Sequence, residues 1–236
     1  MKLIILIIII LIFFKFINLD YFTFKSVNNK DDRFITTYDN FLNEKQCKYL
    51  SNFIINHKLN NQNNLSELFN SSYGILVKFR DNLDHYKKFK ENNLLPIYEL
   101  FKRVKDPNCN AFVFNSLMIK ANSKTKNGIG VHYDNTLLIK TGLLKRFILP
   151  KWVSVIYLNL PKNFKGGSIM INNFRNYNFY CPKAKIQPKV GKYIKFQGDS
   201  SHIVNDIDSD EADYRISIIF EQYIIDDKVS IPFSIY

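Results

Sequence analysis

Two histidines and one aspartate in the second half of the sequence have the types and spacing of a metal site. His132 and Asp134 are separated by one residue, and on an extended segment such positions point to the same face. His202 follows later, at the beginning of another β-rich segment. Two imidazoles and a carboxylate form the facial triad that binds non-haem Fe(II) and leaves coordination positions open for other ligands. We therefore predict that these three residues bind a metal ion.

An arginine after His202 extends this predicted site. A guanidinium group binds a carboxylate through two parallel N–H donors, so Arg215 is expected to bind a carboxylate-containing ligand. Ser217 lies on the same face of that strand and can add a hydroxyl. A His-x-Asp tripeptide alone is common by chance, and a single histidine is more often structural than catalytic. The ordered set of His-x-Asp, a later His and Arg-x-Ser is more specific, and it predicts an iron site with a co-substrate.

The elements that must position these residues are short β-strands. Turn residues, for example Gly166-Gly167 and Gly198-Asp199, separate the β-rich segments. Many short strands with polar connections favour a sandwich or jelly roll over a doubly wound fold, and the sequence contains no glycine-rich nucleotide-binding motif. The expected strands cover residues 112–120, 129–133, 152–160, 168–171, 192–196, 202–204 and 214–223.

The region before these strands, residues 38–110, is expected to be mainly helical. Apolar residues recur at helical spacing over 44–57, and Asn43 is a suitable N-cap for that helix. A second helix is expected over 94–104, because Pro96 is favourable in a first turn and apolar residues follow on one face.

At this point the sequence resembles the 2-oxoglutarate- and Fe(II)-dependent dioxygenases, and within them the prolyl 4-hydroxylase-like catalytic domain. The similarity extends over about residues 38–223 and rests on several segments in the same order as in that family. These segments are 39–42 with 45–47 (DNFL and KQC), 131–135 (VHYDN), 154–159 (SVIYLN), 166–167 (GG) and 188–196 (PKVGKYIKF).

The resemblance implies a mostly β fold of the α+β class, with a double-stranded β-helix (jelly-roll) core and flanking N-terminal helices. It implies that the three predicted metal ligands hold Fe(II). Arg215, helped by Tyr157 and Ser217, would pair with the distal carboxylate of 2-oxoglutarate. The implied activity is hydroxylation of a peptide or protein side chain with 2-oxoglutarate and O₂ as co-substrates, and with L-ascorbate as a reductant. The region 135–150 is the expected lid over the site.

Two departures from the prolyl hydroxylase pattern concern the substrate. Collagen-type prolyl hydroxylases usually carry Lys at the position of Arg215, and the connection before Arg215 is longer here, with an acidic stretch at 206–213. A nucleic-acid demethylase of the same superfamily is a competing interpretation, although that branch carries a second Arg near the position of Glu221. A non-catalytic jelly-roll binding module and a membrane-tethered, lectin-like interaction protein are two further hypotheses.

The composition of the whole chain limits these interpretations. The 236 residues are 46% hydrophobic, enough for one sizeable core or two small ones and too apolar for a disordered chain. A formal net charge of +12 suggests an anionic partner. However, only six of the 33 basic residues are Arg, and the abundance of Lys, Asn, Ile, Phe and Tyr indicates an A/T-rich coding bias, so a nucleic-acid partner is not expected. Cys47, Cys109 and Cys181 lack Cys-x-x-Cys spacing, which excludes a cysteine-based zinc site but leaves one disulfide open.

The N-terminus carries a long apolar run that suggests a membrane segment. The residues from Leu3 to Phe14 are all apolar, and no small-residue cleavage site follows them. We therefore favour a signal-anchor over residues 1–19 rather than a cleaved signal, followed by a polar spacer over 20–37. The catalytic domain would cover 38–236, with a helical part at 38–110 and the jelly-roll core at 111–225. Such an anchor would place this domain in a secretory, ER-type lumen, whereas a cleaved signal would lead to secretion.

Overall fold

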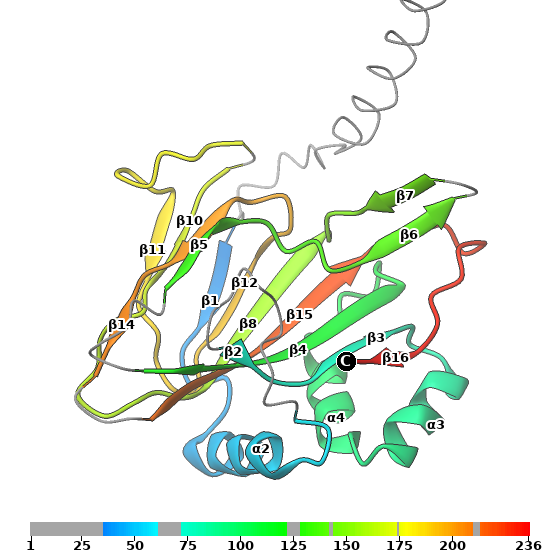
Figure 1. The fold of residues 1–236 in the computed structure, drawn as a ribbon, viewed down its shortest axis with the longest axis horizontal. Helices are drawn as coiled ribbons and strands as arrows, with labels where there is room; N and C mark the ends of the chain where they lie inside the picture. Colours follow the sequence, from blue (N-terminus) through cyan, green and yellow to red (C-terminus); the bar gives the residue numbers. More distant parts are fainter. Residues whose placement is uncertain (1–34, 61–71, 122–127, 142–143, 174, 210–212) are drawn as a thin grey trace, which may run out of the picture.

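Two antiparallel β-sheets form most of the molecule (Figure 1). The computed structural model describes residues 35–60, 72–121, 128–141, 144–173, 175–209 and 213–236. In spatial order, the larger sheet contains β1 (Ile35–Tyr38), β12 (Tyr193–Gln197), β8 (Trp152–Asn159), β15 (Tyr214–Tyr223), β4 (Ala111–Lys120), β3 (Leu76–Phe79) and β16 (Ser234–Ile235), and β2 (Ser72–Tyr73) also pairs with β4. The smaller sheet contains β11 (Ala184–Ile186), β10 (Ile169–Ile171), β13 (His202–Val204) and β5 (Ile129–His132).

The path of the chain between these sheets defines the fold. From β4 onward, the strands β4, β8, β12 and β15 of the larger sheet alternate with β5, the pair β10 and β11, and β13 of the smaller sheet. This alternation of eight antiparallel strands is that of a jelly roll, or double-stranded β-helix. Two short antiparallel pairs lie outside these sheets: β6 (Leu138–Thr141) with β7 (Leu144–Phe147), and β9 (Lys165–Gly166) with β14 (Ile207–Asp208). The predicted mostly β fold with a jelly-roll core is confirmed.

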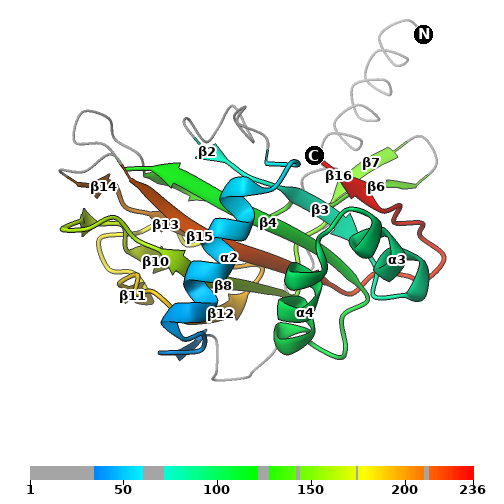
Figure 2. The same ribbon diagram turned by 90° about the horizontal axis from the view of Figure 1, so that it is seen from below.

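Each face of the larger sheet has its own apolar core. Between the two sheets, Leu117 of β4, Ile169 of β10 and Val204 of β13 belong to one buried cluster. On the opposite face, the helices α2 (Glu44–Asn56), α3 (Leu83–Glu91) and α4 (Leu95–Val104) cover the sheet (Figure 2). Because burial of apolar surface is roughly proportional to the area removed from water, these helices stabilise the sheet and leave its inner face for the smaller sheet.

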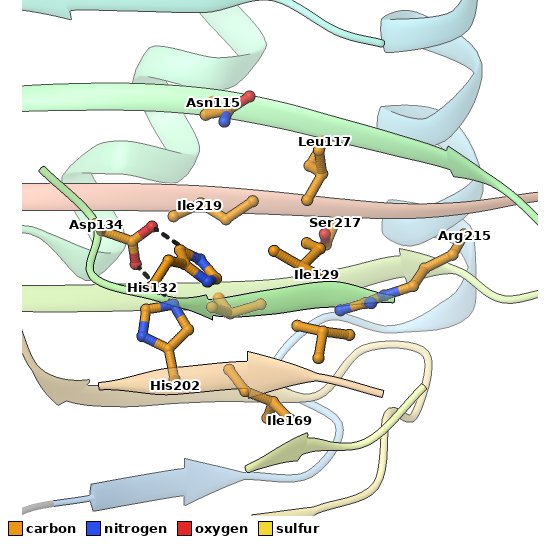
Figure 3. Close-up of a pocket in the computed structure, with 12 residues that line it drawn as sticks. Asn115, Leu117, Ile129, His132, Asp134, Ile169, His202, Arg215, Ser217 and Ile219 are labelled. Atoms are coloured by element: carbon orange, nitrogen blue, oxygen red, sulfur yellow. Dashed lines mark ion pairs between the residues drawn. The ribbon is translucent and has the colours of Figure 1, made fainter. Parts of the chain in front are cut away.

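Strand β15 shows how one sequence serves both faces. Ile216 and Ile218 pack in the cluster beneath the helices. Arg215, Ser217 and Ile219 point into the space between the sheets, where they line a cavity (Figure 3). This follows from the period of two residues along a strand, and it explains why the Arg-x-Ser pair presents both polar groups on one side.

Local sequence signals determine the helices that support the sheet. The Asn43 side chain accepts a hydrogen bond from the backbone N–H of Gln46, and the Gln46 side chain accepts one from that of Asn43, so a complete capping box begins α2. Gly191 has a φ of +79°, and a Cβ there would lie 2.2 Å from the backbone oxygen of Leu42. Only glycine allows this approach, which connects the start of α2 to the segment before β12 through the hydrogen bond from Leu42 N to Gly191 O.

The seven predicted strands and two predicted helices are present with boundaries within two residues, and several further elements were not predicted. Helix α3 is highly charged, and β2 and β3 lie in the region expected to be mainly helical. Strand β1 begins at Ile35, inside the expected spacer 20–37, and β16 extends the sheet beyond residue 225. All three cysteines are free thiols, so the disulfide left open by the sequence does not form in this structure.

The expected membrane anchor over residues 1–19 lies outside the described residues, as does most of the spacer. Within the part of the chain that the structure describes, no helix is both long enough and apolar enough to cross a membrane.

Candidate metal centre and co-substrate cavity

The three predicted metal ligands come together at one end of the space between the sheets (Figure 3). His132 ends β5, Asp134 follows it, and His202 begins β13 directly opposite His132 in the strand register. The Nε2 atom of His202 lies 3.3 Å from Oδ2 of Asp134, and Nε2 of His132 lies 3.9 Å from Oδ1. One ligand atom from each residue lies within 4.8 Å of the others. The predicted juxtaposition of His-x-Asp with a distant His is confirmed.

Hydrogen bonds orient both imidazoles. Nδ1 of His132 lies 2.8 Å from the carbonyl oxygen of Gly130, and Nδ1 of His202 lies 3.2 Å from that of Ser200. A carbonyl only accepts, so each Nδ1 donates its proton, and in the neutral ring Nε2 carries the lone pair. Both Nε2 atoms are those that face Asp134, and such outer hydrogen bonds are the usual way in which proteins fix the tautomer of a metal-binding histidine.

The charges of the three residues influence one another strongly. Burial, followed by the charge of His202, lowers the pKa of His132 to about 4. Burial alone would raise the pKa of Asp134 and lower that of His202, but their attraction reverses both, so Asp134 has a lowered pKa and His202 a raised one. When Nε2 of each histidine is free of its proton, two imidazoles and a carboxylate gathered in this way are the donor set that suits a divalent transition metal.

A cavity of about 60 Å³ extends from these ligands between the sheets (Figure 3). Six of its twelve lining residues are apolar, and the polar ones are the three ligands, Asn115, Ser217 and, at the other end, Arg215. The apolar lining residues are Leu117, Ile129, Val155, Ile169, Val204 and Ile219. The predicted Arg215 and Ser217 therefore share one cavity with the metal ligands.

Arg215 is a buried cation with unused donors. Its side chain is 2% exposed, and among the described residues its Nε and Nη1 atoms have no hydrogen-bond partner. Its guanidinium carbon lies 5.1 Å from the centre of the Tyr157 ring, and the hydroxyl of Tyr157 is also buried without a partner in the described part of the chain. Burial raises the pKa of Tyr157, and the charge of Arg215 partly opposes this. A carboxylate bound at this end would supply the missing acceptors, so the residues present fit both a metal ion and an anionic co-substrate.

A loop beside the ligands carries residues that the sequence did not single out. The Tyr133 hydroxyl accepts a hydrogen bond from the backbone N–H of Arg175 and donates one to the hydroxyl of Tyr177. Tyr177 is 58% exposed and Tyr180 is fully exposed. Ser201, adjacent to His202, donates to the backbone oxygen of Asn176. Tyrosines are frequent throughout this chain, so the sequence offered no signal that marked these.

Glu221 lies on the same face of β15 as Arg215 and Ser217, and its role was not predicted. It is 2% exposed, and its carboxyl group accepts hydrogen bonds from Thr136 and Tyr223. Burial, followed by the charge of Asp134, raises the pKa of Glu221 to about 7. Near the position where the demethylase interpretation requires a second Arg, this chain therefore has a buried carboxyl group.

The chain is similar to known proteins in its structure rather than in its sequence. No protein-family model and no curated protein matches the chain. Among solved structures, IDO from Bacillus thuringiensis has a TM-score of 0.50 and 14% identity, covering 81% of this chain and 90% of its own. The viral collagen prolyl hydroxylase vCPH from Paramecium Bursaria Chlorella virus-1 has a TM-score of 0.47 and 16% identity, and the match covers 83% of this chain and 98% of that one. An oxidoreductase of the 2OG-Fe(II) oxygenase family from Burkholderia pseudomallei has a TM-score of 0.47 and 14% identity, and the match covers 83% of this chain and 87% of that one.

The chain has a double-stranded β-helix fold, which it shares with IDO from Bacillus thuringiensis. The alternation of strands between two sheets and the His-x-Asp…His cluster between them agree with this fold. At 14–16% identity the likeness concerns the fold, so the substrate must be argued from the residues of this chain.

Proposed function

We propose that this protein is an Fe(II)- and 2-oxoglutarate-dependent dioxygenase that hydroxylates a peptide or protein side chain, in the manner of the prolyl 4-hydroxylases. The observation that carries the proposal is a single cavity with a metal-ligand cluster at one end and, at the other, a buried Arg215 whose Nε and Nη1 have no hydrogen-bond partner among the described residues. 2-Oxoglutarate has a keto acid at one end, which can bind a metal, and a second carboxylate at the other end, which can bind an arginine.

Each residue of the cavity has a role in this proposal. His132, Asp134 and His202 would hold Fe(II) through one face and leave the side toward the cavity open. Arg215 would bind the distal carboxylate, with Ser217 beside it, while the apolar walls exclude water. The bound Fe(II) and co-substrates supply the oxidising chemistry, in which 2-oxoglutarate and O₂ become succinate and CO₂ as one C–H bond becomes C–OH. Ascorbate would serve as an accessory reductant.

The surroundings of the site support a polypeptide substrate. Exposed rings of Tyr177 and Tyr180 lie on the loop that is bonded to Tyr133, between two of the ligands. Tyrosine provides a large contact area at low conformational-entropy cost and suits an extended chain. Preference for a prolyl residue rests on the sequence resemblance. Membrane anchorage through residues 1–19, with the domain in a secretory lumen, rests on the apolar run from Leu3 to Phe14.

Turnover of 2-oxoglutarate by the full chain tests the proposed function. With Fe(II), ascorbate and 2-oxoglutarate, the protein is expected to produce succinate, and production should stop in His132→Ala. Peptides incubated with the protein should gain the mass of one oxygen atom. If succinate does not exceed that made by His132→Ala with any peptide or protein supplied, the enzyme assignment is wrong and a non-catalytic binding module is favoured.

A further inference from the structure

Glu221 is buried where a carboxyl group is costly. In the larger sheet its cross-strand neighbours are Val113 on β4 and Val153 on β8. A carboxyl group removed from water needs compensating hydrogen bonds, and an apolar residue of similar size would often be at least as stable in its place. Packing alone therefore does not explain why this position of β15 carries Glu.

The contacts of Glu221 lead to the metal-ligand segment. Its Oε1 atom accepts a hydrogen bond from the Thr136 hydroxyl at 2.5 Å, and its Oε2 atom accepts one from the Thr136 backbone N–H at 3.2 Å. The Tyr223 hydroxyl also donates to Oε2. Both carboxyl oxygens thus hold one residue, Thr136, which is two residues after Asp134 and 85 residues from Glu221 in sequence.

The segment that these bonds hold has little regular structure of its own. Asp134 follows the last residue of β5, and the next strand, β6, begins only at Leu138. His132 and His202, in contrast, lie on paired strands that fix their backbones. Of the three ligands, Asp134 therefore depends most on contacts made by its neighbours.

We propose that Glu221 is a positioning residue that fixes Thr136 and thereby places the Asp134 carboxylate for metal binding. This inference rests on the metal centre in the proposed function. It assigns the buried carboxyl group a task in holding the ligand segment, and it predicts that metal affinity depends on the bonds to Thr136 more than on the bond to Tyr223.

Titration of the full, metal-free chain with Co(II), followed by its visible absorption spectrum, tests the inference without any substrate. Thr136→Val keeps the shape of the side chain and removes the hydroxyl donor, and Glu221→Val removes both acceptors. Each is expected to weaken Co(II) binding by about 10- to 100-fold, the usual effect of removing a group that orients a metal ligand. Glu221→Gln keeps an acceptor for Thr136 and is expected to restore affinity to within about threefold of wild type.

Tyr223→Phe is the matched control, because it removes one bond to Glu221 and leaves those to Thr136. It should bind Co(II) within about threefold of wild type and with the wild-type spectrum. Wild-type affinity in both Thr136→Val and Glu221→Val, with far-ultraviolet circular dichroism unchanged, would overturn the inference, and so would an equal loss in Tyr223→Phe. Failure of the wild-type chain to bind Co(II) would overturn the metal centre as well, so the two failures are distinguishable.

Discussion

At the scale of single residues, Arg215 is the most informative side chain of the cavity. It is almost fully buried, and two of its nitrogens have no acceptor within the described residues. A buried charged group that lacks its hydrogen bonds costs free energy in the ligand-free protein. A protein that maintains such a group in a cavity is organised for an anionic ligand, since the cost is recovered when that ligand binds.

Removing the Arg215 guanidinium should therefore weaken 2-oxoglutarate binding. We expect Arg215→Ala to lose about 3 kcal/mol of binding free energy, roughly a hundredfold in Kd. Arg215→Lys keeps the charge but not the two parallel donors, so its affinity should lie between those of Arg215→Ala and wild type. Isothermal titration calorimetry measures the affinity. Arg146→Ala is the control because Arg146 is exposed, and equal affinities in wild type and Arg215→Ala would contradict the assignment.

The same reasoning predicts a gain in stability for a second variant. Arg215→Met replaces a buried cation, two of whose nitrogens lack a hydrogen-bond partner among the described residues, by an apolar side chain of similar length. The ligand-free protein should become more stable by about 1 kcal/mol. Thermal unfolding without ligand should show a higher Tm than wild type, and added 2-oxoglutarate should no longer raise the Tm. A lower Tm for the ligand-free variant would mean that Arg215 already has a stabilising partner.

At the scale of elements, the loop between β10 and β11 is the structure most closely connected to the ligands. It is bonded to Tyr133, which lies between two ligands, and to Ser201, which precedes the third. In the region 135–150, which the sequence suggested as a lid, Leu137 and Ile139 pack in a cluster with Tyr223. The loop from β10 thus provides the exposed aromatic side chains next to the metal site.

The Tyr133 hydroxyl should control how firmly this loop is held. In Tyr133→Phe the backbone N–H of Arg175 and the hydroxyl of Tyr177 each lose a hydrogen-bond partner. The free energy that holds the loop in place should fall by about 1 kcal/mol. We expect backbone amides at 173 and 175–178 to exchange with deuterium severalfold faster, measured by mass spectrometry. Tyr180→Phe is the control, because Tyr180 is fully exposed. Unchanged exchange in Tyr133→Phe would show that other contacts hold the loop.

At the scale of the whole molecule, the two faces of the larger sheet have different roles: one packs against the helices and the other lines the cavity. Its helix-covered face is packed with aromatic residues, for example the edge-to-face pair of Phe79 and Phe89. Its inner face carries the cavity. Asp81, between β3 and α3, connects the helices to this sheet through the Tyr98 hydroxyl and the ammonium groups of Lys102 and Lys105.

The stability contributed by Asp81 should depend on pH. Burial opposes its ionisation, but bonds from Lys105, Tyr98 and Lys102 outweigh this and lower its pKa. Because the folded-state pKa is below the ordinary value, the contribution is complete above about pH 4 and is lost as the pH falls through the folded-state pKa. Asp81→Asn should cost about 1–2 kcal/mol at pH 7, and this cost, measured by thermal unfolding, should decrease progressively as the pH falls below about 4. Asp208→Asn is the control: Asp208 is exposed, so this variant should leave the stability unchanged over the same pH range. A pH-independent cost for Asp81→Asn would mean that packing, not charge, is responsible.

Much of the architecture could be predicted because it follows from local patterns. Strand periodicity identified β4, β8 and β15, and the capping signal at Asn43 identified the start of α2. Strands β3 and β16 were missed because each is short and is stabilised by pairing with a distant segment rather than by its own residues. Helix α3 was missed because its charged sequence buries only Phe89, so little apolar periodicity marked it.

The sequence by itself determined the fold class and the chemical groups of the candidate site. An extended His-x-Asp segment places both side chains on one face, and the two-residue period of β15 places Arg215 beside Ser217. Only the tertiary structure decided what surrounds these groups, including the hold of Glu221 on Thr136 across 85 residues. The reason is physical: periodicity and turn signals act between near neighbours, whereas which distant side chains meet depends on how the two sheets close upon each other.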